Sequence, residues 1–106
     1  MKVLFDQGTP APLRLSLTGH EVKTAFECGW AQLENGALLA VAEADGFEVF
    51  VTTDQNLQYQ QNLKQRGIAI VVLATANWPR LKPHAQLIAD AVDAIVAGAY
   101  VEVQTP

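Results

Sequence analysis

The sequence predicts an α/β domain in which helices cover both faces of a mostly parallel central sheet of four to five strands. Two observations support this class. Short apolar runs, of which Ile68–Leu73 is apolar on both faces, have the composition of buried parallel strands. Segments with apolar residues at helical spacing alternate with these runs, as in sheets whose strands are joined by helices. We therefore expect one three-layer α/β/α domain over residues 1–106.

The first predicted elements follow from local signals near the amino terminus. Lys2–Phe5 is a short buried strand that ends at Asp6. Thr9 is a good helix N-cap and Pro10 suits the first helical position. A helix should therefore begin there and stop at Gly19, since glycine commonly ends helices.

The middle of the chain continues the alternation. His20–Lys23 predicts entry into a second strand, whose start lies at the amino edge of the sheet and makes His20 a structural residue. Asn35 should cap a helix that runs to about Asp45. Phe47–Thr52 is then the third strand.

The last third of the chain completes the sheet. Asp54–Gln65 predicts a loop and irregular helix, and Ile68–Leu73 a central strand. Pro83 opens a helix with apolar residues at regular 3–4 spacing, and Gly98 ends it. Tyr100–Val103 is a last short strand, placed at an edge of the sheet.

Composition limits the classes of function. Half of the residues are hydrophobic and 17% are charged, with a net charge of −4. An acidic chain with scattered Lys and Arg argues against strong non-specific binding to DNA. No apolar run approaches the roughly 20 residues of a membrane-spanning helix, and no signal peptide is evident. A single cysteine, Cys28, cannot form an internal disulfide, which favours a cytoplasmic protein with a buried, unreactive thiol.

Two aspartates occupy corresponding positions after predicted strands. Asp6 follows the first strand and Asp54 follows the third. Ligands gather at the carboxyl edge of parallel sheets, and neighbouring strands lie about 4.8 Å apart. Two carboxylates there suit Mg²⁺ or Mn²⁺ and predict metal-assisted phosphodiester hydrolysis. The alternative is that each aspartate caps the turn that follows it.

Four short motifs resemble a known family. Met-Lys-Val-Leu-Phe-Asp-Gln-Gly-Thr-Pro at the start is followed by Gly-His-Glu-Val, Asn-Gly-Ala-Leu-Leu and Val-Thr-Thr-Asp-Gln-Asn-Leu. This frame, which spans roughly Met1 to Leu73, is similar to the small PIN-like proteins of the DUF5615 type. The resemblance implies a PIN-like fold and a Mg²⁺- or Mn²⁺-dependent ribonuclease with three or four acidic ligands. It also implies a role as the toxin of a bacterial toxin–antitoxin pair, with a cognate antitoxin as partner.

The resemblance assigns metal ligands residue by residue. Asp6 matches the first acid of the family and Asp54 the acid after the third strand. The helix-start acid falls on Asn35, beside Glu34 as a substitute, and a further acid falls on Asn56. Asparagine keeps an oxygen ligand but lacks the charge, so this set would bind Mg²⁺ weakly.

The family often has an Asp-Glu-Asn sequence after the first strand. Gln7 stands here in place of that glutamate, so one carboxylate is missing.

Polar and aromatic residues around the two aspartates are candidates for contact with single-stranded RNA. Amides hydrogen-bond sugars or base edges, aromatic rings stack on bases, and an arginine binds phosphate. The alternative is that the amides face solvent and the aromatics close the edge of the sheet. The candidates for substrate contact are Gln7, Tyr59, Gln60, Trp78 and Arg80.

Three functions therefore remain open from the sequence. The first is a PIN-like ribonuclease, and the second is a PIN-like protein that binds RNA or protein without cleaving, which Asn35 and Asn56 favour. The third is a receiver-like domain with Asp54 as phosphate acceptor and Thr75 as switch. A lysine after the fifth strand, which a receiver needs, is missing. A homodimer is compatible with each.

Overall fold

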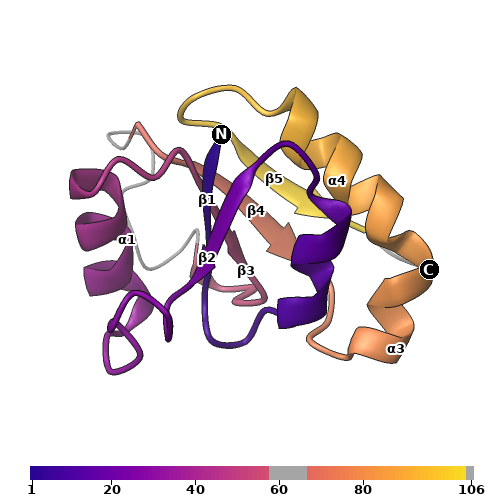
Figure 1. Cartoon of the computed structure of the whole chain (residues 1–106), viewed down its shortest axis with the longest axis horizontal. Coiled ribbons are helices and arrows are strands. Elements are labelled where there is room, and N and C mark those ends of the chain that lie inside the picture. The colour runs from indigo at the N-terminus through magenta and orange to yellow at the C-terminus, as the bar shows by residue number, and fades with distance from the viewer. Residues whose placement is uncertain (58–66, 105–106) are drawn as a thin grey trace.

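The α/β class and the parallel sheet are confirmed. The computed structural model describes residues 1–57 and 67–104, and these form one five-stranded sheet in which every pairing is parallel. The strand order is β2-β1-β3-β4-β5 (Figure 1). The strands are β1 (Lys2–Phe5), β2 (Glu21–Thr24), β3 (Val49–Thr52), β4 (Ala69–Leu73) and β5 (Tyr100–Val103).

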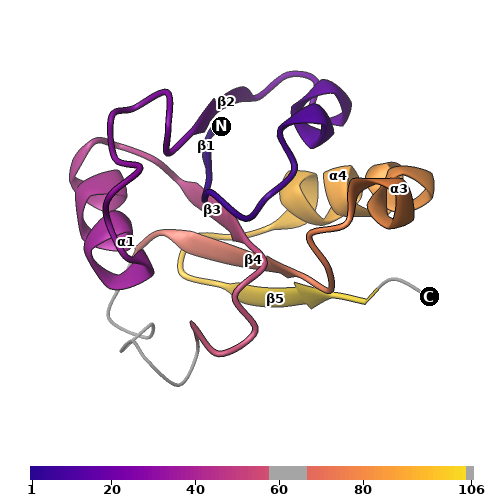
Figure 2. The same cartoon turned by 90° about the horizontal axis from the view of Figure 1, so that it is seen from below.

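Helical segments cover both faces of this sheet. Figures 1 and 2 place α1 on one side of the strands, and α3 and α4 on the other. The short helix η1 lies on the same side as α4. The helical segments are η1 (Ala11–Ser16), α1 (Asn35–Ala44), α3 (Trp78–Leu81), η3 (Lys82–His84) and α4 (Ala85–Ala94).

Side chains of successive strand residues point to opposite faces, so the sheet supports two separate apolar cores. Strand β4 is buried along its whole length because helices cover both of its faces. The core under α1 includes Leu4, Leu38, Leu39, Phe50 and Ile70. The core under η1 and α4 includes Val3, Phe5, Leu13, Leu17, Ile88 and Val92.

Two predicted helix caps are wrong. The segment after Pro10 is a 3₁₀ helix that ends at Ser16, and Pro10 itself occupies the cap position. The Thr9 hydroxyl lies instead within hydrogen-bonding distance of Asp6 and of the Val51 carbonyl. Asn35 is the first residue of α1 rather than its cap, which is Glu34.

Several other boundaries differ from the sequence prediction. The single helix expected from Pro83 is two consecutive segments, η3 and α4, preceded by the short helix α3, and α4 ends at Ala94 rather than at Gly98. Asn77 caps α3, because its side-chain oxygen accepts a hydrogen bond from the Arg80 amide. Most of the predicted Asp54–Gln65 loop and irregular helix lies outside the described residues.

The contacts of His20 agree with the structural role predicted for it at the amino edge of the sheet. His20 comes just before β2, and its Nε2 pairs with the Asp93 carboxylate of the segment α4. This contact ties α4 to the edge of the sheet and gives His20 the structural role expected of it.

Among residues 1–57 and 67–104, no helix has the length and apolar character needed to cross a membrane.

Candidate functional site

The two aspartates lie at the ends of adjacent strands. Strands β1 and β3 are neighbours in the sheet, with Phe5 in register with Val51. From β1 the chain continues to β2 on one side, whereas β3 is followed by β4 and β5 on the other. The gap between β1 and β3 is therefore the point where the strand order reverses, the usual place for a ligand in an open parallel sheet. Asp6 and Asp54 flank this point.

The Asp6 carboxylate is buried and strongly hydrogen-bonded. Asp6 is only 6% exposed. Oδ1 accepts a hydrogen bond from the Thr9 amide at 3.0 Å and lies 2.7 Å from the Thr9 hydroxyl. Oδ2 accepts a hydrogen bond from the Thr52 hydroxyl. A buried carboxylate needs such donors, and here they come from the turn after β1 and from the end of β3.

The Asp54 carboxylate is more accessible and has fewer partners. Oδ1 accepts a hydrogen bond from the Asn56 amide at 3.0 Å, which closes a local turn. Oδ2 accepts one from the Asn35 side-chain amide, also at 3.0 Å. Each oxygen of a carboxylate can accept about two hydrogen bonds, so both retain capacity for another ligand.

Thr52 connects the two aspartates. Its hydroxyl donates to Asp6 Oδ2 and accepts a hydrogen bond from the Asp54 backbone amide at 3.0 Å. Because a hydroxyl has one proton, donation to Asp6 leaves the Thr52 oxygen free to accept from Asp54. The position of the Asp54 backbone is therefore fixed relative to the buried Asp6 carboxylate.

The predicted metal ligands are only partly assembled. Asn35 meets Asp54, as the resemblance implies, but with its amide nitrogen toward the carboxylate. Asn56 contributes its backbone amide, and the side chains of Asn56 and Glu34 belong to exposed residues. Within residues 1–57 and 67–104, no group of three or more His, Cys, Asp or Glu side chains is arranged to hold a metal.

This donor set suits one weakly held hard cation rather than two. Mg²⁺ commonly binds one or two carboxylates and completes its shell with water and substrate phosphate. The Asp54 carboxylate would supply such ligands. Rotation of the Asn35 side chain would add its amide oxygen. Asp6 presents less of its carboxylate to such an ion, because the residue is only 6% exposed and its oxygens accept hydrogen bonds from Thr9 and Thr52.

The turn after β1 packs closely against the end of β3. A Cβ atom added to Gly8 would lie 2.6 Å from Thr53 Oγ1, which is closer than real Cβ contacts. Glycine at this position therefore allows the turn to reach Thr53. The same turn forms one wall of a cavity of about 550 Å³ that also contacts Thr24, the last residue of β2, and Phe26 in the turn after it.

The residues of this cavity that were not predicted as site residues include Arg14, Phe26 and Glu27. Arg14 donates two hydrogen bonds to Glu27, with Nη2 2.6 Å from Oε1. Phe26 is 79% exposed. A lone aromatic residue in a turn has no periodic pattern around it, so the sequence offers little signal for it. Gln7, a predicted substrate residue, does line the cavity.

The other predicted substrate residues are not gathered at this point. Trp78 is partly buried and packs against the core under α4, which supports the structural alternative for its ring. Arg80 is an exposed residue of α3. The side chain of Gln55 donates to the Leu73 carbonyl, which ties the turn after β3 to the end of β4. Tyr59 and Gln60 lie outside the described residues.

Three pKa values near the edge strand differ from their ordinary values. Hydrogen bonds from Arg14 and from the Thr24 amide lower the pKa of Glu27 to about 2. The same ion pair raises the pKa of Arg14. Cys28 is half-buried rather than buried as expected, and its partial burial raises the pKa of the thiol, which favours the protonated, unreactive form.

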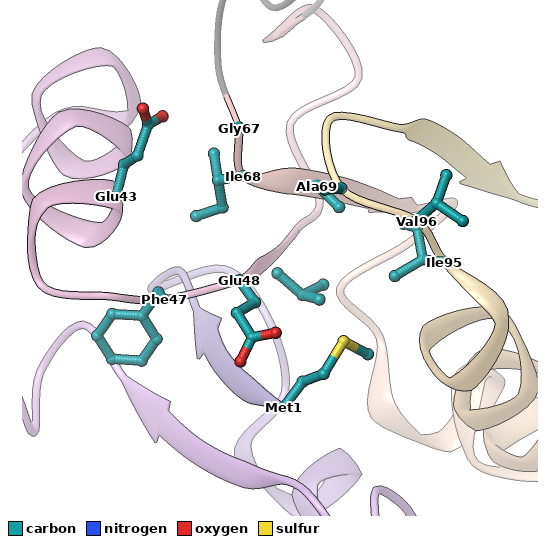
Figure 3. Close-up of a pocket in the computed structure, with 11 residues that line it drawn as sticks. Met1, Glu43, Phe47, Glu48, Gly67, Ile68, Ala69, Ile95 and Val96 are labelled. Atoms are coloured by element: carbon teal, nitrogen blue, oxygen red, sulfur yellow. The ribbon is translucent and has the colours of Figure 1, made fainter.

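A second, smaller cavity lies at the opposite end of the strands. It has a volume of about 170 Å³ and lies between α1, the starts of β3 and β4, and the segment after α4. Figure 3 shows Met1, Phe47, Ile68 and Val96 around it, with Glu43 and Glu48 as its acidic residues. Its lining is mainly apolar, so the polar turns at the carboxyl ends remain the candidate site.

The strand order does not separate the open functions. The order β2-β1-β3-β4-β5 is common to doubly wound domains, which include receivers. The proposed receiver switch, Thr75, accepts a hydrogen bond from the Asn77 amide through its hydroxyl.

Comparison with known proteins adds no assignment: no family model, curated protein or solved structure matches this chain.

Proposed function

We propose that this chain is a PIN-like ribonuclease of the DUF5615 type with a reduced acidic site that uses one Mg²⁺ or Mn²⁺ ion. The observation that carries the proposal is the pairing of Asp54, whose carboxylate keeps acceptor capacity, with Asn35 at the switch point of the sheet. The resemblance of the four motifs supports the same assignment. The substrate class is single-stranded RNA.

Asp54 and Asp6 have different roles in this proposal. Asp54 is the metal-holding residue, with Asn35 beside it. Asp6 is a positioning residue, because it acts on Asp54 through the Thr52 hydroxyl. Asp54 would hold a divalent ion whose chemistry, when bound, would be to activate a water and to stabilise the leaving oxygen of a phosphodiester. Asp54 and Asn35 would orient that ion at the end of β3.

The test is cleavage of single-stranded RNA by the purified protein with Mn²⁺. Asp54→Ala should abolish cleavage and leave the thermal unfolding curve nearly unchanged. Asp90→Ala is the matched control, since it removes one negative charge from an exposed position on α4. Cleavage that continues at the same rate in Asp54→Ala contradicts the proposal.

A second candidate is a PIN-like protein that binds RNA without cleaving it. The observation that favours it is the burial of Asp6, which leaves Asp54 as the one accessible carboxylate of the pair. Titration with Mg²⁺ by calorimetry separates the two functions. Heat at millimolar metal that disappears in Asp54→Ala supports the ribonuclease, whereas RNA binding without any metal-dependent heat supports the second candidate.

The cellular role we propose is that of a cytoplasmic toxin held by a cognate antitoxin. This role follows from the family resemblance. The reading frame next to the gene provides the test: co-expression of its product should relieve growth inhibition by this chain. Inhibition that is absent without the neighbour, or unchanged with it, contradicts the toxin role but leaves the ribonuclease proposal intact.

A further inference from the structure

We infer that the cavity between η1, the turn after β1 and the turn after β2 binds a nucleobase of single-stranded RNA next to the Asp54 site. This inference rests on the proposed function and adds a recognition subsite to it. The cavity has a volume of about 550 Å³, within the usual range for small-molecule sites of roughly 300–1,000 Å³. Its residues come from three separate segments of the chain.

The aromatic wall of the cavity is Phe26. Its ring is 79% exposed although the residue follows a strand at the edge of the sheet. The neighbouring Ala25 is fully buried and anchors the turn, because its amide donates to the Phe5 carbonyl at 2.9 Å. A fixed backbone that presents an aromatic ring to solvent is a suitable platform for a stacked base.

Polar groups of the cavity complement a base edge. Gln7 is exposed on the turn after β1, and its amide both donates and accepts hydrogen bonds. Arg14 is held by two hydrogen bonds to Glu27, and its guanidinium keeps further N–H donors. The occupant can thus be stacked on one side and hydrogen-bonded on the other.

Charge selects a base over a phosphate as the occupant. Glu27 and Asp6 both contact the cavity, and Glu27 neutralises the arginine there. An anionic phosphate would meet this acidic lining, whereas a neutral base would not. The chain as a whole has a net charge of −4, which further disfavours a phosphate clamp.

The cavity also adjoins the proposed site of cleavage. Gly8 lies in the turn that lines the cavity, and its close approach to Thr53 places that turn beside the residue preceding Asp54. A strand of RNA that leaves the cavity across Gln7 and Gly8 reaches the end of β3. Recognition of one base would therefore define which neighbouring phosphodiester faces Asp54.

The experiment measures RNA binding without cleavage. A short single-stranded RNA that contains 2-aminopurine is titrated with the full chain in EDTA, and both fluorescence quenching and anisotropy are recorded. Phe26→Ala should raise Kd about tenfold and remove the quenching, as expected from loss of one stacked base. Phe26→Leu, which keeps an apolar side chain without a ring, should also lose the quenching.

Leu15→Ala is the matched control. Leu15 is likewise 79% exposed but does not line the cavity, so its replacement should change Kd by less than about twofold. Equal binding by Phe26→Ala and Leu15→Ala overturns the inference, as does a lack of RNA binding by the unaltered protein. Failure of the catalytic proposal looks different: Asp54-dependent cleavage is absent while Phe26-dependent quenching persists.

Discussion

The turns after β1 and β3 begin with the same kind of residue but use it differently. Asp6 is buried and accepts hydrogen bonds from Thr9 and Thr52, whereas Asp54 is half-buried and shares its oxygens with Asn35 and Asn56. Both aspartates follow an apolar strand, so the strands do not decide the difference. Nearby hydroxyl groups do, because they satisfy Asp6 inside the fold and leave Asp54 as the accessible carboxylate.

The largest change in stability is expected when each of the two carboxylates is removed in turn. Asp6→Ala leaves the buried Thr52 hydroxyl without its acceptor and removes one of the two acceptors of the Thr9 amide, so the free energy of unfolding should fall by about 3 kcal/mol. Asp54→Ala should lower it by less than about 1 kcal/mol, since water can reach the exposed Asn56 amide. Urea unfolding of the two variants measures both changes. Equal losses would contradict the distinction between the two turns.

Removal of the connecting hydroxyl should have a smaller effect. Thr52→Val keeps the shape of the fully buried side chain but cannot donate to Asp6 or accept from the Asp54 amide. We expect a loss of about 1.5 kcal/mol in the free energy of unfolding. Thr18→Val, at an exposed position, serves as the control and should be nearly neutral. RNA cleavage by Thr52→Val should also decrease if the hydroxyl positions Asp54.

A further test moves the two turns apart. Gly8→Ala adds a methyl group that would lie 2.6 Å from Thr53 Oγ1, and should cost about 1 kcal/mol of stability. Thr53→Ala in the same chain removes the clash and should recover most of this loss. A double-mutant cycle from thermal or urea unfolding gives the coupling. Additive effects of the two changes would show that the turns are not in tight contact.

The smallest expected effect concerns the exposed ion pair beside these turns. The pKa of Glu27 is lowered from 4.5 to about 2, so the stability it contributes is present above pH 4.5. That contribution should be lost as the pH falls through 2, where the carboxylate becomes protonated in the folded state. The difference in unfolding midpoint between the unaltered protein and Glu27→Gln should therefore shrink as the pH falls from 4.5 to 2. It should also shrink in high salt. A difference independent of pH contradicts the lowered pKa.

Much of the fold could be predicted because buried strands leave a clear pattern in the sequence. The bounds of β1 and β5 agree with the prediction, and β4 differs by one residue at its start. Helix starts were harder, because Thr9 and Asn35 have the residue types of caps yet direct their side chains elsewhere. Such choices depend on partners distant in sequence, which local patterns do not contain.

The candidate site was predictable in position but not in detail. A parallel sheet places Asp6 and Asp54 at the same edge, whereas the adjacency of their strands could not be predicted, because the sequence does not fix the strand order. Their different burial could not be predicted, since it depends on how the Thr9 turn packs beside β3. Phe26 was missed because its exposure and its place beside Gln7 are properties of the folded chain.

The end of β2 affects how two molecules of this protein can associate through their edge strands. Strand β2 lies at an edge of the sheet, where free backbone groups would invite a strand from another molecule. At Thr24, however, the amide donates to the Glu27 side chain and the carbonyl accepts from the Cys28 amide. This end of the edge is thereby closed by its own chain, so the Thr24 backbone groups are not free to pair with a strand of another molecule.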